Sequence, residues 1–386
     1  MLLENKKIAI VGGGPGGLTL AKLLQLNRAD VKVYERDWNK DARVQGSPLD
    51  LHEDSGLAAI RKANLLNEFK QNFLIGADRM QIMDENAEVF FSDHNDKPEE
   101  DFGYEHFRPE IARGTLRRIL LDSLQPETVI WDSHFLSMEV QDKGWLLHFK
   151  NRPSQYADLV IAADGANSKI RPYVTDINAF YSGITMLEGN IYNADKTAPR
   201  MNTLLRGGKI MAFGNQKDLL IGQKGDGEIG FYASFKTDEN WASTNGLNYS
   251  DKIQILNWFR ETYPEWDNVW EELFGAAETP FIPRPIYCMP LGQNWEAQSN
   301  LTLLGDAAHL MPPFAGEGVN MAMRDALELN DCLTSDRHDS IPEAIAQYEN
   351  NMRERASKVA LESLENGERM HSENALQTML DFFSGH

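Results

Sequence analysis

The start of the chain carries the pattern that most constrains its fold. Ile8–Val11 is a short apolar run, typical of a strand buried on both faces of a parallel sheet. A G-x-G-x-x-G motif at Gly12, Gly14 and Gly17 follows, and then a helical run rich in Leu and Ala. A second apolar strand ends at Glu35, 18 residues after Gly17. This order predicts a Rossmann-like α/β unit.

Each of these residues has a defined task in a dinucleotide site. Gly12 permits the tight turn, Gly14 lets a pyrophosphate approach the backbone, and Gly17 lets the helix pack closely on the strand. The helix N-terminus attracts the phosphates. Glu35 stands where an acid accepts hydrogen bonds from a ribose 2′-OH, which disfavours a 2′-phosphate. The ligand is therefore FAD or NAD rather than NADP, with a glycine turn that binds no ligand as the alternative.

Two further segments in the first half of the chain could reach that ligand. Leu159–Ala162 reads as a strand, and the turn at Asp164-Gly165 leads to a short helix whose N–H groups could face an anion. Arg113 begins an amphipathic helix that runs to Leu124. The alternatives are an ordinary strand-turn-helix corner and a solvated surface arginine.

The pattern changes after about residue 175. Short alternating strands separated by glycines and prolines predict a mostly antiparallel sheet with one covered face. We expect a discontinuous FAD-binding domain (1–68, 102–175 and 286–333), a substrate-binding domain (69–101 and 176–285) and a C-terminal bridging helix (334–386).

A second strand-to-helix junction lies near the end of the chain, in "GDAAHLMPPFAGEGVN". An apolar strand delivers Asp306, and a helix begins near Gly318 after a loop rich in proline and glycine. A second helix N-terminus aimed at the ligand suggests a long molecule held at both ends. FAD fits that requirement better than NAD.

Composition excludes several classes of function. The net charge is −20, which disfavours nucleic acid and anionic membranes as partners. Two cysteines, Cys288 and Cys332, are too few for a disulfide framework or a Cys-rich metal site. Apolar runs are too short for a signal peptide or a membrane span. We expect a cytoplasmic monomer without a metal.

The chain resembles the class A flavoprotein monooxygenases, which have the aromatic hydroxylase fold. The resemblance rests on three motifs in order, "GGGPGG", "DG" and "GDAAHLMPPFAGEGVN". Within that family it is most similar to the TetX-type tetracycline-inactivating enzymes, through "VYERD", "LDLH", "PEIARGTLRRILL", "TVIWD" and "SFKT".

The resemblance assigns roles to the motif residues. It implies that the glycines bind the pyrophosphate, that Glu35 binds the adenosine ribose, and that Asp306 binds the ribityl or pyrophosphate portion of FAD. It implies that Asp164 helps to bind flavin and NADPH. The remaining FAD contacts that it implies are Arg36, Arg43, Arg113, Pro313, Gly316, Gly318, Val319 and Asn320.

The same resemblance predicts a substrate pocket. In the TetX type a glutamine, an arginine and a histidine hold the polar head of tetracycline, and this chain has Glu188, Lys209 and Gly230 at those positions. The polar edge of the preferred substrate is therefore expected to differ from that of tetracycline. The full predicted set is Glu188, Lys209, Met211, Phe231, Pro313, Phe314 and Gly316.

The implied reaction is carried by the cofactor, and no catalytic side chain is assigned. NADPH or NADH reduces FAD, O₂ forms a flavin C4a-hydroperoxide, and a planar phenol- or enol-bearing polycycle, such as tetracycline, is hydroxylated. His309 is expected to be structural rather than a general base. Two alternatives stay open, namely a hydroxylase of another aromatic metabolite or an FAD-dependent reductase on the same fold. A binding protein without catalysis is a third.

Overall fold

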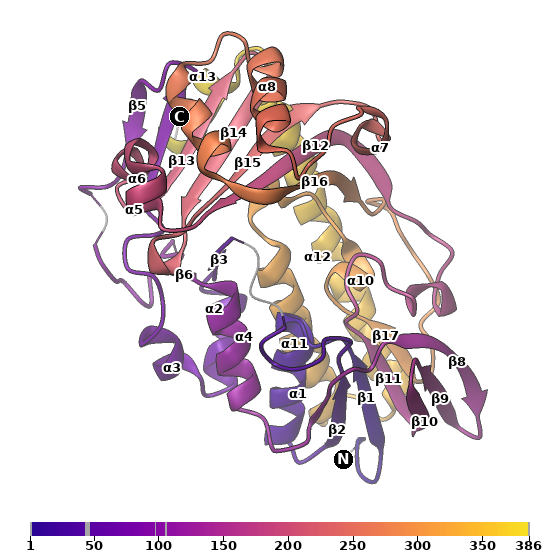
Figure 1. Cartoon of the computed structure of the whole chain (residues 1–386). Helices are drawn as coiled ribbons and strands as arrows, with labels where there is room; N and C mark the ends of the chain where they lie inside the picture. The colour runs from indigo at the N-terminus through magenta and orange to yellow at the C-terminus, as the bar shows by residue number, and fades with distance from the viewer. Residues whose placement is uncertain (1, 43–46, 97, 105, 385–386) are drawn as a thin grey trace.

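Two sheets lie at opposite ends of the molecule, and long helices run between them (Figure 1). The computed structural model describes residues 2–42, 47–96, 98–104 and 106–384. One sheet is parallel and the larger one is mostly antiparallel. This confirms the predicted α/β fold with a Rossmann-like domain, a second sheet and a C-terminal helix.

The parallel sheet carries the nucleotide-binding half. Its five strands stand in the order β17–β11–β1–β2–β7. β11 is buried along its whole length, as expected for a strand between two helical layers. Helices α1, α4 and α11 share one apolar core with the sheet. The bounds are β1 (Lys7–Val11), β2 (Asp30–Tyr34), β7 (Val129–Ile130), β11 (Leu159–Ala162), β17 (Leu301–Leu303), α1 (Pro15–Leu26), α4 (Arg113–Asp122) and α11 (Gly318–Thr334).

Smaller elements extend this half. A three-stranded antiparallel sheet shares the core of the parallel sheet, and β3 pairs with β6 in a separate two-stranded ribbon. Their bounds, with those of two short helices, are β8 (Phe135–Gln141), β9 (Gly144–Phe149), β10 (Arg152–Ala157), β3 (Leu49–Asp50), β6 (Glu110–Ile111), α2 (Gly56–Lys62) and α3 (Leu66–Lys70).

The larger sheet has seven strands in the order β16–β12–β15–β14–β13–β4–β5. Its neighbours are antiparallel except β13 and β4, which are parallel. The bounds are β4 (Met80–Asp84), β5 (Val89–Ser92), β12 (Phe180–Ile191), β13 (Lys209–Gly214), β14 (Lys217–Gln223), β15 (Ile229–Lys236) and β16 (Glu278–Cys288).

The two faces of this sheet have different neighbours. An aromatic-rich core joins one face to helices α6, α8 and α9. The other face contributes Ile82 and Phe213 to a cluster with the C-terminal helices. The bounds of the helices in this half are α5 (Ala194–Thr197), α6 (Pro199–Leu205), α7 (Trp241–Thr244), α8 (Lys252–Thr262) and α9 (Glu271–Ala276).

The C-terminal segment ties the two halves together. α12 (Ile341–Met370) packs Tyr348 into the core of the parallel sheet and Met370 into the cluster beneath the seven-stranded sheet. The Ser340 hydroxyl caps α12 by accepting from the Glu343 N–H at 3.4 Å. The helical tail divides at His371, and α13 (Ala375–Ser384) follows. Among the described residues, none of the helices combines the length and apolar character needed to cross a bilayer.

Candidate active site

The glycine turn after β1 has little room for side chains. A Cβ added to Gly12, whose φ is +113°, would lie 2.1 Å from the carbonyl oxygen of Ala163. A Cβ on Gly17 would lie 2.2 Å from the Gly12 oxygen. Gly14 caps α1, and apart from its chain neighbours none of the described residues has an atom within 4 Å of a Cβ added there. The turn is thus closed by protein around Gly12 and Gly17 and open to a ligand at Gly14.

Glu35 is fixed over this turn. The side chain is 3% exposed at the end of β2, and its Oε2 accepts from the Gly13 N–H at 2.6 Å. Its Oε1 accepts from the Asp37 N–H at 2.9 Å. The carboxylate therefore has the fixed orientation that ribose recognition requires. Arg36 is exposed, and Arg43 lies outside the described residues.

Asp164 borders the same turn, because Gly12 packs against the chain at residues 163–164. Its Oδ2 accepts from the Lys169 N–H at 2.9 Å. Its Oδ1 is buried without a hydrogen-bond partner among the described residues. Burial raises the pKa of this carboxyl group. An unsatisfied buried oxygen facing a glycine turn fits a site that a polar ligand completes.

The second predicted loop rests on a buried ion cluster. Asp325 of α11 accepts from the Gly305 N–H at 2.9 Å, from His309 Nε2 at 2.5 Å and from Arg355 Nη2 at 2.7 Å. Burial raises the pKa of Asp325, but His309 and Arg355 together lower it below its usual range. Burial lowers the pKa of His309, and Asp325 more than reverses that. His309 thus supports the loop from beneath.

Asp306 and Arg113 lie close enough for their charges to act on one another. Both side chains are exposed, yet burial among protein atoms raises the pKa of Asp306 and lowers that of Arg113. Tyr232, Asp306 and Glu188 all act on the pKa of Arg113, which places the loop, α4 and the seven-stranded sheet around one space.

The loop then presents an open edge. Pro313, Gly316 and Gly318 are exposed, and α11 begins at Gly318. The first N–H groups of a helix have no intrahelical acceptor, so they attract negative charge on a ligand. Asn320 differs from its neighbours because its side chain is buried. That amide donates to the Asp50 carbonyl at 3.0 Å, which leaves the backbone N–H as its route to a ligand.

A charged group missed by sequence reasoning lies behind this loop. His52 bridges Asp50, at 3.1 Å from Nε2, and Glu317, at 3.0 Å from Nδ1. Burial lowers the pKa of His52, but the two carboxylates outweigh it and raise the pKa to about 9. A Cβ on Gly316 would lie 3.6 Å from Asp50 Oδ2. The "LDLH" segment marks two members, but Glu317 is too distant in sequence for any local pattern to reveal it.

The polar residues of the facing sheet are paired. Glu188, 3% exposed on β12, accepts from Arg284 Nε of β16 at 2.7 Å. Lys209 forms a close ion pair with Glu110 of β6. Met211 lies two residues along β13 from Lys209, so it shares that face, and it is half-buried. These expected residues therefore belong to one sheet face, and each of the two charges has a counter-ion.

One expected residue points the other way. Phe231 is fully buried on the sheet face that α6, α8 and α9 cover, with its ring centroid 5.1 Å from that of Phe274. Tyr232 is paired in register with Glu188 and takes the place on that residue's sheet face. Its hydroxyl lies 3.0 Å from the Ser47 hydroxyl. The expectation for Phe231 is corrected because side chains alternate along a strand, so an error of one residue reverses the face.

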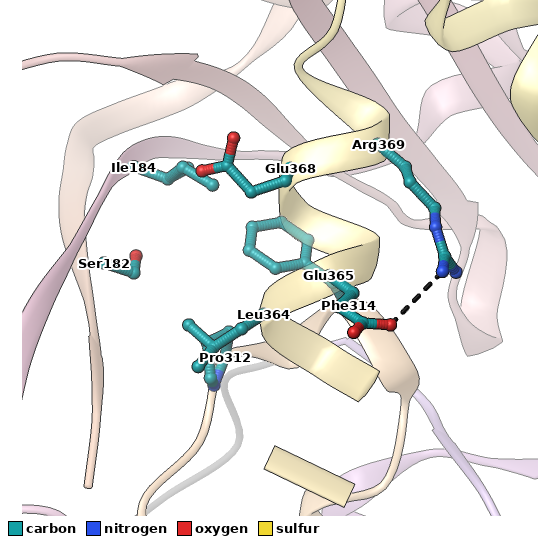
Figure 2. Close-up of a pocket in the computed structure, with 8 residues that line it drawn as sticks. All are labelled: Ser182, Ile184, Pro312, Phe314, Leu364, Glu365, Glu368 and Arg369. Carbon is teal, nitrogen blue, oxygen red and sulfur yellow. Dashed lines mark hydrogen bonds and ion pairs between the residues drawn. The ribbon is translucent and has the colours of Figure 1, made fainter. Parts of the chain in front are cut away.

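A separate cavity of about 380 Å³ adjoins the loop. Figure 2 shows Phe314 against α12, with Ser182 and Ile184 across the cavity. The Phe314 ring centroid lies 5.8 Å from that of His371. Glu365 and Arg369 pair at 3.2 Å on the same helix. Phe314 therefore packs the loop against α12.

The described residues fit an elongated dinucleotide. The open position at Gly14 and the unsatisfied Asp164 oxygen lie at one end, and the exposed start of α11 lies at the other. FAD, which carries a pyrophosphate and a flat ring that develops negative charge, suits both ends. The residues that would hold it come from β1, β2, α4 and the loop before α11.

Comparisons with known proteins agree with this geometry. Residues 292–363 match the model of a family described as an FAD binding domain. Residues 10–40 match an NAD(P)-binding Rossmann-like domain. Monooxygenase asqM of Emericella nidulans is 29% identical over 375 residues, which cover 84% of this chain and 82% of the relative.

Two further comparisons extend along nearly the whole chain. The 3-amino-4-hydroxybenzoate 2-monooxygenase PtmB3 of Streptomyces platensis is 26% identical, over 98% of this chain and 91% of the relative. The crystal structure of tetracycline destructase Tet(55) shares the fold, with a TM-score of 0.77 and 19% identity over 100% of this chain and 96% of that one. The FAD-binding match and the monooxygenases among its sequence relatives show that the chain is an FAD-dependent monooxygenase.

Proposed function

We propose that this enzyme hydroxylates a planar, phenol- or enol-bearing polycyclic compound, with NADPH or NADH as the reductant and O₂ as the oxidant. One observation carries the proposal. Asp306 at the start of the loop and the Tyr232–Glu188 pair on one face of the seven-stranded sheet all act on the charge of Arg113, so they lie close to it. A flat substrate in a cleft between this loop and this sheet face would lie beside a flavin held along the loop.

The chain's own residues would bind, orient and exclude water. Bound FAD would supply the redox chemistry, accepting a hydride and activating O₂. The N-terminus of α11 would stabilise negative charge at the edge of the ring. Pro313, exposed on the loop, would form an apolar wall beside the substrate, and Phe314, which lines the separate cavity, would support it from behind. Asp306 and Arg113 would hold the polar chain of the cofactor.

Tetracycline is one candidate substrate, supported by the motif resemblance and by the fold shared with the destructase. The polar contacts point toward another compound. Glu188 is engaged by Arg284, and Lys209 is engaged by Glu110. The space over Gly230 is occupied by Lys224, because a Cβ on Gly230 would lie 2.5 Å from Lys224 Cε. We therefore expect slow turnover of tetracycline and faster turnover of a planar substrate with a different polar edge.

The reaction class can be tested with isotopic oxygen. The FAD-loaded enzyme is incubated with NADPH and ¹⁸O₂ and with a set of phenolic and enolic polycycles that includes tetracycline. The proposal expects substrate-dependent O₂ uptake and one ¹⁸O atom in the product. Product formation without O₂ would instead support a reductase. Rapid loss of tetracycline absorbance with a low KM would contradict the expected preference.

A further inference from the structure

Lys224 stands at the polar end of the proposed substrate cleft. It follows β14 directly, and its side chain extends over Gly230 of β15, on the same strand face as Tyr232. Its ammonium donates to Asn190 Oδ1 of β12 in a close hydrogen bond. Gly230 on β15 therefore makes room for the long cationic side chain of Lys224, which begins the connection between β14 and β15.

The acceptors at this end are already used. Glu188 is buried, and its Oε2 accepts from Arg284 Nε at 2.7 Å and forms an ion pair with Nη2 at the same distance. Its Oε1 lies 3.4 Å from the Asn190 amide nitrogen. Arg284 remains half exposed, with 51% of its side chain open to solvent. The buried partner, Glu188, thus accepts hydrogen bonds, and the exposed partner, Arg284, donates them.

Donors outnumber acceptors on the accessible side. A lysine ammonium has three N–H donors and a guanidinium has five, while Asn190 accepts one hydrogen bond from Lys224 and Glu188 accepts one from Arg284. Burial lowers the pKa of Lys224, and the charges of Glu188 and Glu228 oppose that. A desolvated ammonium gains more from an anionic partner than a solvated one does.

On the basis of the proposed function, we propose that Lys224 and Arg284 form an anion-recognising end of the substrate cleft. The substrate would carry an anionic oxygen, as a carboxylate or an ionised enol, on the ring edge that faces β15. Glu188 would act as the buried counter-ion that fixes Arg284 rather than as a direct contact. Lys224 and Arg284 are then specificity-determining residues.

Two substitutions separate this role from a structural one. Lys224→Met keeps the apolar stem and removes the charge, so it should weaken binding of an anionic ligand. Glu188→Gln keeps the shape and removes the competing carboxylate, so it should strengthen that binding. Arg284 is less suitable, because its removal leaves Glu188 buried without a partner. Lys358→Met, in an exposed ion pair on α12, is the matched control.

The probe is a pair of isosteres that differ in charge, 3-hydroxy-2-naphthoate and its neutral amide. Each is titrated into FAD-loaded enzyme without NADPH, and the change in flavin absorbance gives Kd. We expect the acid to bind about tenfold more tightly than the amide, as a charge-assisted contact implies. That ratio should fall to about one to threefold in Lys224→Met, rise in Glu188→Gln and stay unchanged in Lys358→Met.

Equal binding of acid and amide by the unaltered enzyme would overturn the inference. So would an undiminished preference in Lys224→Met, or a lost preference in Glu188→Gln, in variants with normal FAD content. The titration uses neither reductant nor O₂. An enzyme that shows the charge preference but no ¹⁸O incorporation would therefore contradict the proposed reaction and leave the anion site standing.

Discussion

The two walls of the cleft are specified in different ways. The cofactor wall is made of backbone, in which Gly12, Gly14 and the start of α11 present N–H groups and open space. The sheet wall is made of side chains, in which Glu188, Arg284 and their neighbours pair with one another across strands. The first wall suits an invariant ligand such as FAD, and the second can change its chemistry while the fold stays the same.

The glycine turn gives the sharpest test of the backbone wall. Gly12→Ala should abolish soluble, FAD-loaded protein, because its Cβ would lie 2.1 Å from a carbonyl oxygen at a φ of +113°. Gly14→Ala should leave the melting temperature of the apoprotein unchanged, because the described part of the chain places nothing but the neighbouring residues within 4 Å of its Cβ. Its affinity for FAD should still fall at least about tenfold, since the pyrophosphate needs that space. Equal effects of the two changes on stability would contradict the assignment of a structural role to Gly12 and a ligand-binding role to Gly14.

The buried ion cluster beneath the cofactor loop gives the next largest effect. Asp325→Asn leaves His309 and Arg355 without their shared carboxylate. Loss of one partner from a buried ion pair costs about 3–5 kcal/mol of unfolding free energy. Urea denaturation measures it, with Glu354→Gln in the exposed pair with Lys358 as the control that should not change. Similar stabilities for both variants would contradict the role of Asp325 in supporting the cofactor loop.

The sheet wall can be tested at two adjacent residues. Phe231→Ala should destabilise the fold by about 3 kcal/mol, because it empties part of an aromatic core. Tyr232→Phe should change stability by less than about 1 kcal/mol and raise the KM for substrate. Urea denaturation and steady-state kinetics measure the two effects. A KM change confined to Phe231→Ala would show that the faces are reversed.

The smallest effect concerns pH and the cluster behind the loop. The pKa of His52 is about 9 in the fold and 6.5 ordinarily, so the folded state holds the proton more tightly. Its stabilisation is complete below pH 6.5 and is lost as pH rises through about 9. We expect the unfolding free energy to fall by up to about 3 kcal/mol across that range. His52→Gln should remove this pH dependence, and an unchanged slope in the variant would contradict it.

The sequence predicts the backbone wall better than the side-chain wall for a physical reason. Glycine spacing, strand and helix in the first 35 residues are local, so the Rossmann-like domain can be recognised without tertiary information. The two faces of β15 differ by a single residue, so Phe231 and Tyr232 could be distinguished only once the strand's neighbours were known.

Long-range pairing was also invisible in the sequence. His52 and Glu317 lie far apart along the chain, and Lys224 is 34 residues from its acceptor Asn190 on β12. The predicted helical tail is present, but its division at His371 coincides with a buried contact between that imidazole and the Ser234 hydroxyl at 2.7 Å. No short-range pattern encodes a partner on a distant strand.

The central claim is that one wall holds the cofactor and the other selects the substrate. The most direct test measures the Kd for FAD and the Kd for 3-hydroxy-2-naphthoate in Gly14→Ala and Lys224→Met. We predict that Gly14→Ala loses affinity for FAD but, once saturated with FAD, binds the naphthoate normally. Lys224→Met should bind FAD normally and the naphthoate about tenfold more weakly. Loss of both affinities in either variant would contradict the claim.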